Sequence, residues 1–177
     1  MLPAGPLMKE HRLIEQMIGL VADRHDRIGQ EEKVDPVFID AAVDFIRTYA
    51  DRCHHGKEED ILFRELEKKD ISDEHKKTME GLVSDHKFGR KVTGELEEAN
   101  EAYKHGKKAA LKDIQQALQK LTDLYPQHIE IEDKHFFLPV MDYFSDEEKS
   151  SMLSEMMDFD REMIHKKYRQ IVDKFKG

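Results

Sequence analysis

The chain has 177 residues, of which 38% are charged and 38% hydrophobic, and its formal net charge is −9. That length fits one domain over residues 1–177, and the negative charge argues against nucleic acid as a partner, because phosphate binding needs clustered positive charge. The longest apolar runs have about six residues, far fewer than the roughly 20 of a membrane helix, so no membrane contact is expected. With no recognisable secretion signal and with Cys53 as its lone cysteine, the sequence predicts a cytoplasmic protein without an internal disulfide.

Hydrophobic side chains recur every 3.5 to 3.6 residues in five segments, which predicts five helices and no strands. Asp35 and Pro36 are typical of a helix N-terminus, since aspartate caps the first turn and proline needs no hydrogen bond there. Ser145 and Glu148 form a capping box at the start of the fifth segment. The predicted helices cover about residues 7–28, 36–69, 72–103, from just after 106 to about 139, and from 145 onward.

Pro126 lies within the fourth predicted helix, where its missing N–H should bend or locally break the helix. The connections between the long helices are short, which favours antiparallel neighbours. The expected fold is therefore all-α: an antiparallel up-and-down four-helix bundle with an additional C-terminal helix.

The most informative pattern is an internal repeat of the form H-x-x-x-E-D-x-x-F, which starts at His55 and again at His128. Positions i and i+4 share one face of an α-helix and lie about 6 Å apart along its axis. In each copy the histidine and the glutamate, Glu59 or Glu132, can therefore reach the same ion or ion pair. This spacing predicts two halves of one metal site.

Counting residues from the turns places further histidines at the same level of the bundle. His55 lies about 14 residues before the end of the second helix and His86 about 14 after the start of the third, so both lie roughly 20 Å from their shared turn. His11, near the start of the first helix, falls at that end too. The predicted metal ligands are His11, His55, Glu59, His86, His128 and Glu132.

Without metal, this layer would bury two carboxylates among imidazoles in a medium of low dielectric, at a cost of several kcal/mol per unpaired ion. Carboxylate and imidazole ligands without thiolate suit iron or manganese better than structural zinc. Two six-coordinate ions have about twelve positions, of which four imidazoles, two bridging glutamates and a bridging oxo or hydroxo group would leave about two open. The expected cofactor is two iron ions with such a bridge, and manganese or zinc are the alternatives.

The chain resembles the hemerythrin-like, or HHE cation-binding, family over its first four predicted helices. The stretches 53–63, 85–90 and 128–139 carry the resemblance. It implies a non-haem di-iron site in which the four histidines are terminal ligands and the two glutamates, Glu59 and Glu132, bridge the ions.

Two positions depart from the pattern of the oxygen-carrying hemerythrins. Those carriers have an H-x-x-x-H pair on the third helix, whereas Leu82 and Arg90 stand four residues either side of His86 here, so a fifth histidine is missing. The carriers also have an aspartate at the spacing of Asp133, but the internal repeat favours its neighbour Glu132. These departures weigh against reversible dioxygen storage; related family members are associated with sensing of oxygen, nitric oxide or iron and with repair of iron centres.

Three further residues have competing interpretations. His54 is expected about 100° around the helix from His55, as an outer or surface residue, with metal ligation as the alternative. His135, close beyond Glu132 on the same helix, is a candidate outer partner of the site. Cys53 is interpreted as a small packing residue, with a redox role near the metal as the alternative.

The leading functional hypothesis is a di-iron protein that binds or senses a small ligand such as dioxygen or nitric oxide. It rests on a histidine-rich site with open positions beneath mainly apolar side chains. The alternative is a di-iron enzyme with oxidase, peroxidase-like or iron-centre repair activity, and an enzyme acting on organic substrates should have a pocket with orienting polar groups. A third hypothesis treats the metal only as a staple of the bundle. The sequence names no protein partner.

Overall fold

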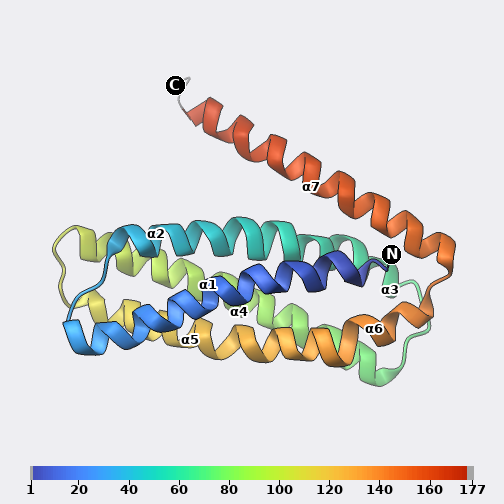
Figure 1. Ribbon diagram of the computed structural model, residues 1–177, viewed down its shortest axis with the longest axis horizontal. Helices are drawn as coiled ribbons and strands as arrows, with labels where there is room; N and C mark the ends of the chain where they lie inside the picture. The colour runs from blue at the N-terminus through green and yellow to red at the C-terminus, as the bar shows by residue number, and fades with distance from the viewer. Residues whose placement is uncertain (1, 175–177) are drawn as a thin grey trace.

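The computed structural model describes residues 2–174, with side chains as far as Met163. These residues are helical apart from their connections, with no strand among them, so the expected all-α class is confirmed. In Figure 1 the long helices lie side by side along the long axis of the molecule, and α7 leaves one end at an angle. None of the described helices combines the length and apolar character that membrane crossing requires. The elements in order are α1 (Ala4–Glu31), α2 (Pro36–Phe45), η1 (Ile46–His55), η2 (Glu58–Phe63), α3 (Arg64–Leu66), α4 (Asp73–Lys104), α5 (Ala110–Ile131), η3 (Glu132–Phe136), α6 (Phe137–Val140), η4 (Met141–Tyr143) and α7 (Asp146–Lys174).

Side-chain caps explain where three of these helices begin. Asp35 accepts a hydrogen bond from a backbone N–H in the first turn of α2 at 3.0 Å, and Ser72 accepts one from the backbone of His75 in α4 at 3.2 Å. The predicted capping box of α7 is confirmed, since Ser145 and Glu148 each accept a hydrogen bond from the backbone N–H of the other, at 3.2 and 2.9 Å.

Two helices differ from the prediction in where they end or break. α1 continues through Gly29, because Glu32 rather than a glycine takes the left-handed conformation that closes the helix, with φ of 52°. α5 continues across Pro126 without a break. Leu121 and Tyr125, which precede the proline, are buried in the core, and such packing outweighs the local preference of one residue.

A layer of buried polar side chains divides the apolar core into two clusters. One cluster joins α1, α2, η1, α4 and α5 and includes Ile14, Leu96 and Leu118. The other lies toward the α6 end of the molecule, where η2, α6 and α7 meet, and includes Leu62 and Phe136. Burial of these two clusters fixes the helices around the polar layer, and this layer contains the candidate site.

Both copies of the sequence repeat lie where the α-helix widens into π-helical turns. The second long helix changes to a π-helix at η1 and again at η2, and α5 changes at η3, which begins with Glu132. Such turns close i to i+5 hydrogen bonds and occur frequently at functional sites. They change which side chains face inward, so a constant helical period is a poor guide in these segments.

α7 packs against the segment that joins η1 and η2. The ring of Phe159 covers Gly56, and a Cβ added there would lie closer to the ring than normal contacts allow. Arg64 donates hydrogen bonds to both carboxylate oxygens of Glu155 in α7, at 2.9 and 2.8 Å. The first half of α7 is thereby fastened to the end of the molecule that contains the polar layer.

Replacing Gly56 by alanine should destabilise the protein, because the added Cβ would lie 2.8 Å from Cζ of Phe159 and the ring would have to leave its packed position. We expect the free energy of unfolding, measured by urea denaturation, to fall by roughly 1–3 kcal/mol. Gly94→Ala is the matched control, since nothing lies within 4 Å of a Cβ added there. Alanine in the interior of α4 should raise the free energy of unfolding by up to about 1 kcal/mol. Equal effects of the two substitutions would contradict the close packing of α7.

Candidate metal centre

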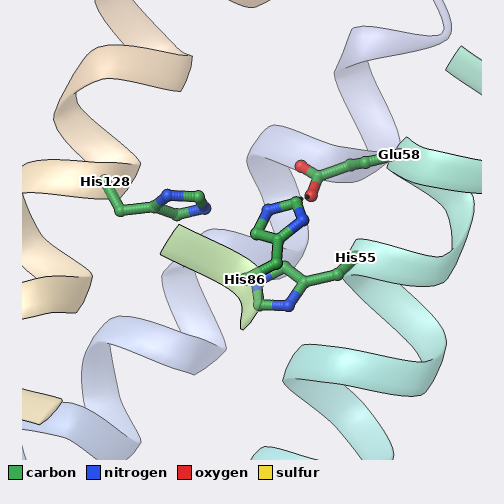
Figure 2. Close-up of side chains that lie close together, drawn as sticks. All are labelled: His55, Glu58, His86 and His128. Atoms are coloured by element: carbon green, nitrogen blue, oxygen red, sulfur yellow. Dashed lines mark ion pairs between the residues drawn. The ribbon is translucent and has the colours of Figure 1, made fainter. Parts of the chain in front are cut away.

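Seven buried side chains meet in the polar layer, and none is more than 4% exposed. They form two groups of candidate metal ligands, and in each group the ligand atoms lie within 4.8 Å of one another. Figure 2 shows the first group, whose side chains converge from different helices. The first group is His55, Glu58, His86 and His128, and the second is His11, His54, Glu58 and Glu132.

Glu58, the first residue of η2, belongs to both groups because its two oxygens face different histidines. Oε1 lies 3.1 Å from Nε2 of His54 in the second group. Oε2 lies 3.3 Å from Nε2 of His86 in the first group. This carboxylate therefore offers one oxygen to each group.

Glu132, the first residue of η3, repeats this arrangement. Its Oε1 lies 3.1 Å from Nε2 of His128, and its Oε2 lies 3.1 Å from Nε2 of His11. The pairs His128 with Glu132 and His54 with Glu58 both have i, i+4 spacing and the same contact distance. The structural repeat therefore starts at His54, one residue before the start that the sequence pattern predicts.

The atoms that face the interior of this layer have no hydrogen-bond partner in the protein. They are the Nε2 atoms of His11, His54, His86 and His128 and both carboxylate oxygens of Glu58 and Glu132. Buried polar atoms without partners are costly, and carboxylates are the most costly of all. Cations between the two groups would satisfy these lone pairs, and the donor set of imidazole and carboxylate fits iron or manganese.

Each of the five clustered histidines has a carboxylate beside its other ring nitrogen, Nδ1. An Nδ1–H that donates to a carboxylate leaves the Nε2 lone pair free for a metal and fixes the orientation of the ring. This pattern is typical of metal-binding histidines. The nitrogen–oxygen pairs are His11 with Asp133 at 2.7 Å, His54 with Glu10 at 2.9 Å, His55 with Asp51 at 3.4 Å, His86 with Glu59 at 2.7 Å and His128 with Asp85 at 3.3 Å.

Arg90 of α4 holds two of these outer carboxylates in place. It donates to Asp51 at 2.7 Å and to Glu59 at 2.6 Å. Burial opposes the charge of Glu59, but hydrogen bonds from His86 and Arg90 outweigh it and lower the pKa of this carboxyl to about 2. Glu59 is therefore a charged acceptor for His86 outside the centre.

The inner carboxylates change the proton affinity of the histidines they face. Burial alone would lower the pKa of His54, but the charge of Glu58 and the hydrogen bond to Glu10 outweigh it and raise the pKa to about 10. Glu132 acts in the same way against burial and raises the pKa of His128 to about 10. Metal binding must displace the protons on these nitrogens, so uptake of cations should release protons.

The structure brings together five of the six predicted ligands and leaves Glu59 outside. The side chain of Glu59 is 27% exposed and faces Nδ1 of His86, the outer nitrogen. Glu58, which the sequence pattern did not single out, takes the inward place. The five predicted residues that meet are His11, His55, His86, His128 and Glu132.

His54 also differs from the expectation, since it lies inside the layer and is 1% exposed. η1 thus brings a fifth histidine into the layer, to which α4 contributes His86. The doubled pattern of His54 and His55 followed by Glu58 and Glu59 contains two i, i+4 pairs, and helical spacing alone does not choose between them. One sequence feature could have chosen between the two glutamates. Arg90 lies on the facing helix α4, and its positive charge draws Glu59 away from the centre.

The remaining candidates lie outside the cluster. Asp133 accepts hydrogen bonds from Nδ1 of His11 and from Arg12, so it stands behind the centre rather than in it. His135 is exposed. Cys53 is buried, and burial raises the pKa of its thiol to about 12, which fits its interpretation as a packing residue.

A cleft of about 150 Å³ reaches the first group at His55. Exposed Arg52 and Arg90 line it together with buried Tyr125, so it connects the surface with the polar layer. The ring of Tyr125 lies parallel to that of His55, with 6.4 Å between the ring centroids. Pockets for drug-sized ligands have roughly 300 Å³ or more. This cleft is therefore of a size for small molecules.

The helical fold and the two clusters of buried histidine and glutamate define this protein as a cation-binding helical protein. Its sequence matches the hemerythrin HHE cation-binding domain over residues 3–140, which is most of the chain and includes all seven clustered side chains. The chain therefore belongs to the hemerythrin HHE cation-binding family. Comparisons with curated proteins and with solved structures give no significant match.

Removing bound cations should destabilise the protein, because the buried, inward-facing carboxylates and imidazoles would lose the charges that compensate them. At a free metal concentration 100 times the Kd, binding stabilises the folded state by about 2.7 kcal/mol. We expect the free energy of unfolding to fall by about this amount after chelation, as measured by urea denaturation. Chelator already saturated with metal serves as the control, and unchanged stability after complete metal removal would contradict the expectation.

Proposed function

We propose that this protein is an antiparallel four-helix bundle of the hemerythrin kind that holds two iron ions and binds or senses a small ligand such as dioxygen or nitric oxide. The observation that carries the proposal is the placement of Glu58 and Glu132, each of which offers one oxygen to each group of histidines. Two carboxylates in this arrangement suit a pair of ions better than a single ion. Manganese or zinc would fit the same donors.

The proposed ligand set differs from the sequence-based set by Glu58 in place of Glu59 and by the addition of His54. Five imidazole nitrogens and four carboxylate oxygens give nine donor atoms, whereas two six-coordinate ions have about twelve positions. A bridging oxo or hydroxo group would leave about one position for an external ligand. We propose that His55, His86 and His128 hold one ion, that His11 and His54 hold the other, and that Glu58 and Glu132 bridge them.

The protein's own residues would orient the ligands and keep the centre dry, while bound iron would supply redox chemistry and affinity for diatomic ligands. Phe137 stacks on the ring of His11 with 5.6 Å between centroids, and Phe63 stacks on His86 at 6.2 Å. Both phenylalanines are buried. These rings limit the motion of the imidazoles and exclude water from one side of the centre.

The size of the cleft beside His55 favours a small ligand over an organic substrate. The alternative of a di-iron enzyme with oxidase or peroxidase-like activity or iron-centre repair would be supported by multiple turnover with added reductant. Binding without turnover would support the proposed role in small-ligand binding or sensing.

The proposal is tested by the optical spectrum of iron-loaded protein that has been reduced without air. We expect about two iron ions per chain by metal analysis, and new absorption bands when the reduced protein meets dioxygen or nitric oxide. Zinc-loaded protein is the control, because zinc occupies similar ligands without redox chemistry. Iron-loaded protein that gives no spectral response to either gas would contradict ligand binding.

Glu58→Gln and Glu59→Gln provide a matched pair of variants that separates an inner from an outer carboxylate. Glu58→Gln should reduce bound iron to about one ion per chain or less, because the substitution removes a charged ligand shared by both groups. Glu59→Gln should retain two ions and weaken iron affinity by roughly 10-fold, because it changes an outer acceptor, for His86 and Arg90, and leaves the inward-facing ligands in place. Metal analysis and competition with a chelator measure both effects, and the opposite order would support the ligand set predicted from sequence.

A further inference from the structure

Lys57 is an ammonium group with no exposed surface, placed in the short connection between η1 and η2. Its Nζ donates a hydrogen bond to Asp160 of α7 at 2.7 Å and another to Glu10 of α1. Lysine is almost never fully buried unless it is paired. Both of its partners are carboxylates from other helices, so the position of Lys57 depends on α1 and α7 together.

Glu10 connects this lysine to the metal centre. Its second oxygen, Oε2, lies 2.9 Å from Nδ1 of His54, whose Nε2 faces Glu58. A continuous series of polar contacts therefore runs from Asp160 through Lys57 and Glu10 to His54.

α7 lies outside the part of the chain that matches the family, since the match ends at residue 140. Figure 1 shows that only its first part approaches the other helices and that the rest extends away from them. Phe159 and Asp160 of α7 both contact the η1–η2 segment, at Gly56 and Lys57. This contact is therefore an addition to the family domain, placed against the segment that contains three of the proposed ligands.

We propose that α7 regulates the metal centre: Asp160 holds Lys57, and Lys57 positions His54 through Glu10, so that docking of α7 and occupancy of the centre stabilise each other. The inference rests on the proposed metal site. With α7 in place, Lys57 is shielded from water, and Glu10, which pairs with it, holds the ring of His54 with Nε2 inward. Without α7, water would compete for both groups and the ring would lose its fixed orientation. By reciprocity, metal that favours the docked helix must itself be held more tightly when the helix is docked.

The sole cysteine of the chain gives a direct measure of docking. Cys53 is 7% exposed and donates a hydrogen bond to Asp160 at 3.3 Å, so α7 covers it. Its rate of modification by a thiol reagent should report how often α7 leaves the bundle. Because Asp160→Asn also changes the hydrogen bond of Cys53, labelling rates are compared as the ratio of iron-free to iron-loaded protein within each variant.

In the wild-type protein we expect iron loading to slow Cys53 labelling by about tenfold. In Asp160→Asn this ratio should approach one, and transfer of iron to a chelator should become about tenfold faster. Asp158→Asn is the control, because it removes the same charge from α7, whereas Asp158 pairs with Arg161 of its own helix and with no other residue whose side chain the structure describes. The control should behave like the wild type in both measurements.

Two results would overturn the coupling. One is a wild-type labelling rate that is the same with and without iron; the other is Asp160→Asn protein that labels faster but releases iron at the wild-type rate, which would make the contact merely structural. Iron content is measured first on every sample. Failure of the wild type to take up iron would overturn the proposed function together with this inference, whereas two bound ions without coupling would overturn the inference alone.

Discussion

Two buried carboxylates, Glu58 and Glu132, are the constraint on which the rest of the structure depends. Neither is exposed, and none of their four oxygens has a hydrogen-bond partner in the protein. Negative charge in a medium of low dielectric must be compensated nearby. The helices place Nε2 atoms of histidine around the two carboxylates. The space between these nitrogens and the carboxylate oxygens is suited to cations.

Around the centre, charged or polar side chains are paired with side chains of opposite charge in the next layer outward. Each inner histidine is backed by a carboxylate, and several of these carboxylates are backed in turn by a cation, such as Arg90 behind Asp51 and Glu59. Opposite charges thus alternate from the centre to the surface, and each layer orients the one inside it. Lys57 is the most deeply buried of these outer cations, and its hydrogen bond to Asp160 is one of the contacts that join the family domain to α7.

The all-helical class and the capped helix starts could be predicted from sequence because they depend on local chemistry. Hydrophobic periodicity and caps such as Asp35 and Ser145 act within a few residues, and the structure contains them where they were expected. The level of His11 and His86 in the bundle was also predictable, since it depends only on the rise per residue of a helix.

The choice between neighbouring side chains was not predictable in the same way. His54 and His55 stand side by side, as do Glu58 and Glu59, and an assumed constant helical period selected Glu59 as the partner of His55. The structure places both pairs in π-helices, the histidines at the end of η1 and the glutamates at the start of η2, and a partner distant in sequence, Arg90, pairs with Glu59. Inward or outward orientation was thus decided by tertiary contacts that the local pattern does not contain.

Anomalous X-ray scattering at the iron edge from crystals of iron-loaded protein would test the paired centre most directly. The account predicts two peaks, one within ligand distance of Nε2 of His55, His86 and His128 and the other near Nε2 of His11 and His54, with Glu58 and Glu132 touching both. A single peak, or peaks that contact Glu59 in place of Glu58, would contradict it.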